Sequence, residues 1–122
     1  MKILVVDDDL LVRQLTVTAL TYCVNRKVLS FCDGCHAWEY IENGGEFDIV
    51  ISDVNMPKMN GLDLMVRVKE KFPEKIFIIM SGVPDNEMWA SQAGADAFLA
   101  KPFEIKDLFN IVQCFVVEHP PM

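Results

Sequence analysis

Acidic, hydroxyl and amine side chains follow four apolar runs of this sequence, at the points where strands are expected to end. Such groups suit the binding and transfer of phosphate, because carboxylates can hold a metal ion while an amine and a hydroxyl contact phosphoryl oxygens. The set consists of Asp7 and Asp8 after residues 3–6, Asp53 after residues 49–51, Ser81 after residues 76–80 and Lys101 after residues 97–99.

Three carboxylates held close together need a cation. At about 4–5 Å each pair repels by roughly 4 kcal/mol in a medium of effective dielectric constant 20. Oxygen ligands without a nearby His or Cys suit Mg²⁺ or Mn²⁺, and so few protein ligands leave room for water and a phosphoryl oxygen. Asp7, Asp8 and Asp53 are therefore candidates for a divalent metal site, with Lys101 as a second positive group.

The elements that would position these residues alternate along the chain. Apolar and β-branched runs predict strands at residues 3–6, 27–31, 49–51, 76–80 and 97–99. Apolar residues at helical spacing predict a helix after each of the first three strands and after the last one. The four apolar stripes are Val12, Leu15, Ala19 and Cys23; Ala37, Trp38 and Ile41; Leu62, Met65, Val68 and Phe72; and Leu108, Ile111, Val112 and Phe115. A short helix is expected after Pro84 and Asp85, ended by Gly94.

Five strands that alternate with five helices predict a single α/β domain with a parallel sheet and helices on both faces. The carboxyl ends of parallel strands share one edge, where open α/β sheets bind ligands. That edge gathers the acids, Ser81 and Lys101. Turning Lys101 back toward the acids requires a sharp bend, so we expect a cis peptide bond between Lys101 and Pro102.

Composition limits the function classes. The chain has 122 residues, 52% of them hydrophobic, and a formal net charge of −7. An acidic chain argues against direct binding to nucleic acid, which needs clustered Lys and Arg. No apolar run approaches the length of about 20 residues that a membrane span needs, and the first residues lack signal-peptide features, so we expect a cytoplasmic protein.

The four cysteines include a C-x-x-C-H pattern at Cys32, Cys35 and His36. This pattern is typical of covalent haem attachment, and the two thiols could also form a redox pair. We expect neither, because no export signal is visible and Asp33-Gly34 reads as a turn between a strand and a helix. Cys23 and Cys114 are interpreted as small buried apolar residues of helices.

Four blocks of the sequence together resemble the receiver domain of two-component response regulators, including the chemotaxis receivers. They are Asp7-Asp8, Asp53-Val-Asn-Met-Pro57 with Gly61, Met80-Ser81-Gly82, and the segment from Gly94 to Phe103 that contains Lys101-Pro102. The resemblance covers nearly the whole chain, with the blocks in the family's order and spacing. It implies a flavodoxin-like doubly wound fold with strand order 2-1-3-4-5, a receiver domain over residues 1–118 and a tail over residues 119–122.

The resemblance also implies a role for each site residue. Asp53 would accept a phosphoryl group from a kinase phosphohistidine, assisted by Lys101. Asp7, Asp8, Asp53 and the backbone carbonyl of Asn55 would hold Mg²⁺. Ser81 would bond the new phosphate and Phe98 would turn inward as the switch. Many members have Thr where this chain has Ser81 and Tyr where it has Phe98, so the switch lacks a phenol hydrogen bond.

The expected partners are a sensor histidine kinase or phosphotransfer protein upstream, and an effector protein, fused output domain or second copy of the chain downstream. The output face would be the fourth helix, fifth strand and fifth helix. Helical spacing places Ala90 and Ala93 inward and turns Trp89 by about 100° from Ala90, so we expect Trp89 to be partly exposed.

Three other hypotheses are weaker. A receiver-like interaction module without phosphorylation would normally lack one of the acids, the hydroxyl or the lysine, and this chain has all of them. A metal-dependent phosphatase would need a second acid two residues after Asp53, where this chain has Asn55. A flavin-binding domain would need a Ser-, Thr- or Gly-rich phosphate loop after the first strand. We expect a phosphoacceptor and not a turnover enzyme.

Overall fold

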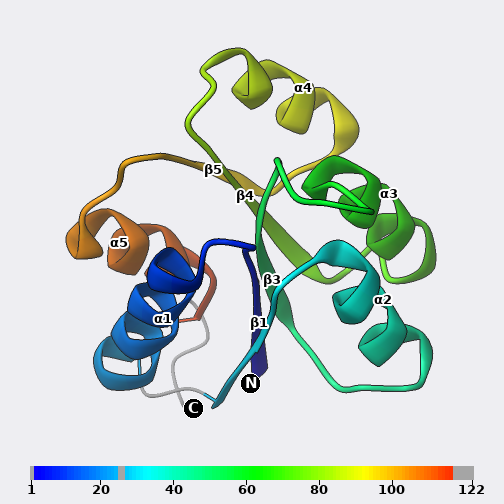
Figure 1. Cartoon of the computed structure of the whole chain (residues 1–122), viewed down its shortest axis with the longest axis horizontal. Helices are drawn as coiled ribbons and strands as arrows, with labels where there is room; N and C mark the ends of the chain where they lie inside the picture. The colour runs from blue at the N-terminus through cyan, green and yellow to red at the C-terminus, as the bar shows by residue number, and fades with distance from the viewer. Residues whose placement is uncertain (1, 25–26, 117–122) are drawn as a thin grey trace.

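Five parallel strands form one sheet in the computed structural model, which describes residues 2–24 and 27–116. The strand order is β2-β1-β3-β4-β5, as expected (Figure 1). The strands are β1 (Lys2–Val6), β2 (Lys27–Phe31), β3 (Ile49–Asp53), β4 (Ile76–Ser81) and β5 (Ala97–Ala100). The predicted fold class is confirmed, and each predicted strand is present with bounds within two residues of the expected ones.

Helices cover both faces of the sheet. In Figure 1 α1 and α5 lie together on one side of the sheet, whereas α2 and α3 lie on the other side with α4 above them. Their bounds are α1 (Leu10–Ala19), α2 (Gly34–Glu42), α3 (Gly61–Lys71), α4 (Asp85–Ala93) and α5 (Ile105–Val116), and a π-helical turn, η1 (Leu20–Val24), continues α1.

Alternate residues of the central strands enter two separate cores, because side chains of a strand point to opposite faces. Leu4 and Val50 pack with α2, α3 and α4. Ile3 and Ile51 pack with α1 and α5. The central strands are buried on both faces, so they read as continuous apolar runs.

Polar side chains and a glycine set the helix ends. Asp9 and Asp33 accept hydrogen bonds from the first backbone N–H groups of α1 and α2, and Asn60 does the same for α3. Gly94 ends α4 with a φ of 106°, in the left-handed region that a glycine adopts without strain. The three side-chain caps mark where α1, α2 and α3 begin after the strands that precede them.

Three sequence-based expectations about helix faces are wrong. Leu15 is exposed, because the buried stripe of α1 runs through Thr16 and Ala19 instead. Ala93 is exposed in the last turn of α4, where Ala90 alone is buried. Cys114 is exposed on α5, with its Sγ 3.3 Å from the carbonyl oxygen of Asn110. The side chain of Cys23 and the tail at 119–122 lie outside the described residues.

Candidate functional site

The predicted site residues meet at the carboxyl edge of the sheet. Asp7 follows β1, Asp53 and Ser81 are the last residues of β3 and β4, and Lys101 follows β5. Parallel pairing aligns these ends, since Asp53 lies beside Met80 and Ser81 lies beside Ala100. Residues from four separate parts of the chain therefore share one edge, as the alternating strands and helices predict.

Three carboxylates converge at this edge. Asp7, Asp8 and Asp53 each offer an oxygen, and these oxygens lie within 4.8 Å of one another. Asp7 is fully buried and Asp53 is 9% exposed, whereas Asp8 is exposed. We call these residues the acid trio. One side of the trio opens to solvent through Asp8, so an ion could enter without unfolding the edge.

Lys101 bridges the two buried members of the acid trio. Its Nζ donates hydrogen bonds to Asp7 Oδ2 at 2.8 Å and to Asp53 Oδ2 at 3.1 Å. The backbone N–H of Lys101 donates to the carbonyl oxygen of Ser81 at 2.9 Å. The peptide bond between Lys101 and Pro102 is cis, as expected. One ammonium group faces three carboxylates, so the edge keeps an excess of negative charge.

Burial and charge shift two pKa values at this edge. Burial raises the pKa of the Asp53 carboxyl above 3.8, and the lowering effect of Lys101 does not cancel it. Burial alone would lower the pKa of Lys101, but the hydrogen bond to Asp7 and the charges of Asp53 and Asp7 raise it above 10.5. Lys101 therefore stays charged, while the Asp53 carboxylate is held in a site that disfavours its charge.

The acid trio fits a hard divalent ion. All three donors are carboxylate oxygens, and no thiol or imidazole belongs to this group. Mg²⁺ and Mn²⁺ prefer such ligands and retain water at the remaining positions. Three carboxylates and the Lys101 ammonium together carry a net negative charge. A divalent ion among the carboxylates would offset it.

Arg13, which the sequence analysis missed, and Gly61 both contact the backbone of the acids. Arg13 donates from Nη1 to the carbonyl oxygen of Asp7 at 2.7 Å. Gly61 begins α3 against the carbonyl oxygen of Asp53, so closely that a Cβ atom at position 61 would collide with it. Five residues separate Asp7 from Arg13, and no local sequence pattern indicates either contact.

Ser81 is buried and is held by the start of α4. Its Oγ accepts hydrogen bonds from the backbone N–H of Val83 at 3.0 Å and from Asn86 Nδ2 at 2.9 Å. Both bonds use the hydroxyl oxygen as acceptor, so the hydroxyl hydrogen is available to donate. The sequence analysis did not identify Asn86, although it lies in the first turn of the helix that follows Ser81.

The remaining predicted residues lie near the edge or on the face beside it. Asn55 is exposed, two residues beyond Asp53. Phe98 is half-buried in β5 and packs against the core under α2, α3 and α4. Trp89 on α4 is 61% exposed, in agreement with the expected exposure, and Met88 beside it is also exposed.

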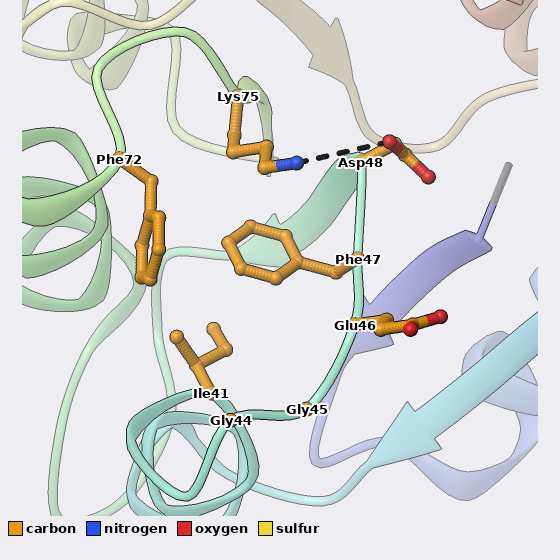
Figure 2. A pocket seen from close by; sticks show the side chains of 8 residues that line it. All are labelled: Ile41, Gly44, Gly45, Glu46, Phe47, Asp48, Phe72 and Lys75. Carbon is orange, nitrogen blue, oxygen red and sulfur yellow. Dashed lines mark ion pairs between the residues drawn. The ribbon is translucent and has the colours of Figure 1, made fainter.

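A cavity of about 360 Å³ lies at the opposite end of β3, between the loops that follow α2 and α3. Figure 2 shows Phe47 and Phe72 facing each other inside it, while Lys75 reaches over to Asp48. The Lys75 Nζ and Asp48 Oδ1 atoms lie 3.8 Å apart. The lining of this cavity includes two acidic residues, Glu46 and Asp48. Glu46 points away from the cavity in Figure 2.

The comparisons with known proteins point to one family. The family model of the response regulator receiver domain matches residues 3–113. Chemotaxis protein CheY1 of Helicobacter pylori is 36% identical over 107 residues, which are 84% of this chain and 86% of CheY1. The DNA-binding transcriptional regulator NtrC of Azospirillum brasilense is 34% identical over 113 residues. That match covers 91% of this chain but 23% of NtrC, so this chain spans less than a quarter of that relative.

Solved structures give the same result. A CheY-like receiver domain protein of Methanospirillum hungatei has a TM-score of 0.87 at 26% identity, with 96% of this chain and 94% of that chain covered. The response regulator TrrA of Thermotoga maritima, solved in complex with Mg²⁺-BeF, has a TM-score of 0.84 at 26% identity. That match covers 93% of this chain and 96% of TrrA.

Proposed function

This chain belongs to the response regulator receiver domain family, and we propose that Asp53 is its phosphoacceptor. Receivers of this family are phosphorylated by histidine kinases in two-component signalling. The observation that carries the proposal is the Lys101 ammonium, which lies 2.8 Å from Asp7 and 3.1 Å from Asp53 at a buried edge with an excess of negative charge. The proposed receiver domain covers residues 1–118.

In the proposed reaction an oxygen of Asp53 attacks the phosphorus of a phosphohistidine. The new O–P bond forms as the P–N bond breaks, and the electron pair of that bond stays on the departing imidazole. Of the two Asp53 oxygens, Oδ2 accepts a hydrogen bond from Lys101, so the proposed attacking atom is Oδ1. The Lys101 ammonium can then contact the phosphoryl oxygens, where negative charge develops during transfer.

Asp7, Asp8 and Asp53 would hold Mg²⁺, with Mn²⁺ as a substitute and the Asn55 carbonyl as a further ligand. When bound, the ion supplies positive charge that stabilises the phosphoryl oxygens during transfer. The acid trio supports this assignment through its oxygen-only donors and its opening at Asp8. Asp7 is also oriented before an ion arrives, because its Oδ1 accepts the backbone N–H of Asp9 at 2.9 Å.

Ser81 would then donate its hydroxyl hydrogen to a phosphoryl oxygen. Its bonds from Val83 and Asn86 tie the start of α4 to this hydroxyl, so a shift of Ser81 toward the phosphate pulls on α4. Phe98 would respond by moving further into the core. The proposed output is a change in the populations of two arrangements of the α4-β5-α5 face.

The proposed partners follow from this scheme. A sensor histidine kinase or a phosphotransfer protein would supply the phosphoryl group. An effector protein, a fused output domain or a second copy of the chain would bind the α4-β5-α5 face, where Met88 and Trp89 are exposed. We also infer that the protein is cytoplasmic and binds neither nucleic acid nor lipid directly. Its proposed role is to carry a signal, not to turn over a substrate as an enzyme. No helix among residues 2–24 and 27–116 is long and apolar enough to span a membrane.

The test is intact-mass spectrometry after incubation with acetyl phosphate and Mg²⁺. Wild-type protein should gain one phosphoryl group, and Asp53→Asn should gain none. Asp48→Asn is the matched control, because it removes the carboxylate from the other end of β3 and should leave labelling intact. If Asp53→Asn were labelled like wild type, the assignment of Asp53 would be wrong. If wild type were not labelled, the chain would be an unphosphorylated interaction module.

A further inference from the structure

The segment Cys32-Asp33-Gly34-Cys35-His36 contains a second cluster of metal-binding side chains, which the proposed phosphotransfer does not use. Cys32 is exposed, whereas Cys35 is half-buried and packs against the core under α2, α3 and α4. The two thiols thus differ in their surroundings. Cys32 is grouped instead with Asp33 and His36, whose ligand atoms all lie within 4.8 Å of one another.

The distances within this cluster resemble the edges of a tetrahedral metal site. Cys32 Sγ lies 3.8 Å from Asp33 Oδ2 and 4.0 Å from His36 Nδ1. His36 Nδ1 lies 2.8 Å from Asp33 Oδ2. A tetrahedral Zn²⁺ ion needs edges of about 3.6 Å from sulfur to nitrogen or oxygen and about 3.3 Å from nitrogen to oxygen. Shifts of about half an ångström or less would satisfy these edges.

The first turn of α2 holds two of the three donors before an ion arrives. Asp33 is buried and caps α2, since its Oδ1 accepts the backbone N–H of His36 at 2.8 Å. The other oxygen, Oδ2, contacts His36 Nδ1 at 2.8 Å, and an ion would take the place of this contact.

Lys58 is the competing cation. Its Nζ lies 3.9 Å from Asp33 Oδ2, and its side chain is 63% exposed. Exposed ion pairs at this distance contribute about 0–1 kcal/mol, so a divalent ion can replace Lys58 at little cost. The exposed positions of Cys32 and His36 leave the fourth side of the cluster open to water.

We propose that Cys32, Asp33 and His36 bind a divalent transition metal ion of the Zn²⁺ class, at a site separate from the acid trio. A thiolate and an imidazole favour such ions over Mg²⁺, whereas the acid trio has the opposite preference. Binding releases the Cys32 thiol proton to solvent. The hydrogen that lies between His36 Nδ1 and Asp33 Oδ2 without the ion must also leave Nδ1, so that neutral His36 binds through Nδ1 and carries its ring hydrogen on Nε2. The two sites of one domain would therefore select different metals.

The test is a titration of the full chain with Co²⁺ in the presence of excess Mg²⁺, which keeps the acid trio filled. Co²⁺ substitutes for Zn²⁺ and gives a near-ultraviolet thiolate-to-cobalt charge-transfer band only when sulfur is a ligand. Wild type should show this band at one equivalent of Co²⁺, and added Zn²⁺ should abolish it. Cys32→Ser should lose the band, and His36→Ala should bind at least tenfold more weakly.

Matched variants separate this site from the other thiols and imidazole of the chain, which has four cysteines and two histidines. Cys23→Ser, Cys35→Ser, Cys114→Ser and His119→Ala should keep the band unchanged. Asp33→Asn should keep the helix cap, because an amide oxygen also accepts the cap bond, yet weaken Co²⁺ binding. Absence of the band in folded wild type, or its loss in Cys35→Ser with retention in Cys32→Ser, would overturn the proposal.

Discussion

The two ends of β3 each hold an Asp–Lys ion pair, but the surroundings of the pairs differ. At the carboxyl end Asp53 and Lys101 lie 3.1 Å apart, with side chains 12% and 19% exposed. At the amino end Asp48 and Lys75 lie 3.8 Å apart, with side chains 43% and 28% exposed. The carboxyl end adds the buried Asp7, whereas the amino end places Lys75 over the Phe47 ring at 5.6 Å.

The difference shows that an ion pair does not by itself mark a functional site. The pair at the amino end is balanced and partly hydrated, so it contributes about 0–1 kcal/mol to stability. At the carboxyl end three carboxylates share one ammonium, and two of them are buried. That end keeps unbalanced charge that a metal ion and a phosphoryl group can relieve, and this imbalance distinguishes the candidate site from the other end.

The largest expected effect concerns the two lysines. Lys101→Met should slow phosphorylation of Asp53 by about 10²-fold, the usual loss when one charge that stabilises a transition state is removed. Lys75→Met should leave the rate unchanged, because Lys75 lies at the other end of the strand. A time course of acetyl phosphate labelling by mass spectrometry measures both rates. Equal rates in the two variants would remove the functional contrast between the ends.

Metal binding should give the next largest effect. A Mg²⁺ concentration ten times the dissociation constant should stabilise wild type by about 1.4 kcal/mol, because the ion binds only the folded state. For a domain of this size that corresponds to a rise in Tm of about 5 °C. Asp8→Ala should lose the rise, and Asp48→Ala should keep it. Thermal unfolding with and without Mg²⁺ measures the effect, and a rise retained in Asp8→Ala would contradict the acid trio as the site.

Removal of the phosphoacceptor charge should stabilise the fold. Because burial raises the pKa of Asp53 in the folded state, its carboxylate is disfavoured there, and Asp53→Asn should be more stable than wild type at neutral pH without Mg²⁺. The folded wild type binds a proton more tightly than the unfolded chain does. The gain should therefore shrink as the pH falls through the raised pKa, and it should vanish below 3.8.

Urea unfolding at several pH values, with Asp48→Asn as the control, measures this gain. The control carboxylate is 43% exposed, so its removal should give no comparable gain. A neutral-pH gain that is equal in the two variants would mean that burial does not distinguish the two ends of β3.

The smallest expected effect is spectroscopic. In a Trp38→Phe background, a beryllofluoride mimic of the phosphate should change the fluorescence of Trp89, because Ser81 is tied to the start of α4. In a Trp89→Phe background the remaining Trp38, which lies 5.9 Å from Arg67, should respond less. Equal responses from the two tryptophans, or none from Trp89, would contradict a signal directed through α4.

Much of the fold and site followed from the sequence because β1, β3 and β4 read as apolar runs that end in polar residues. Parallel strands share one edge, so the grouping of Asp7, Asp53 and Lys101 needed no further information. Helical spacing gives the angles between residues around a helix but not which face is buried. For this reason Leu15 and Ala93 were predicted to be buried, although both are exposed.

The supporting contacts could not be predicted in the same way. The bond from Asn86 to Ser81 depends on the path of the short loop between β4 and α4, and the contact of Gly61 with Asp53 depends on how α3 returns to the strand end. Neither path is set by apolar periodicity. Contacts that depend on loop geometry were therefore the part that only the structure revealed.

The bond between Asp7 and Lys101 joins residues 94 positions apart, which has a consequence for synthesis on the ribosome. A domain emerges with its amino end first. Asp7, Asp8 and Asp53 therefore leave the exit tunnel well before the only ammonium group that contacts Asp7 and Asp53 among the described residues. Until Lys101 emerges, a nascent chain that closed its sheet would bury uncompensated carboxylates. The residue after the last strand thus brings the counter-charge that allows the edge to close, and completion of the domain has to wait for Lys101.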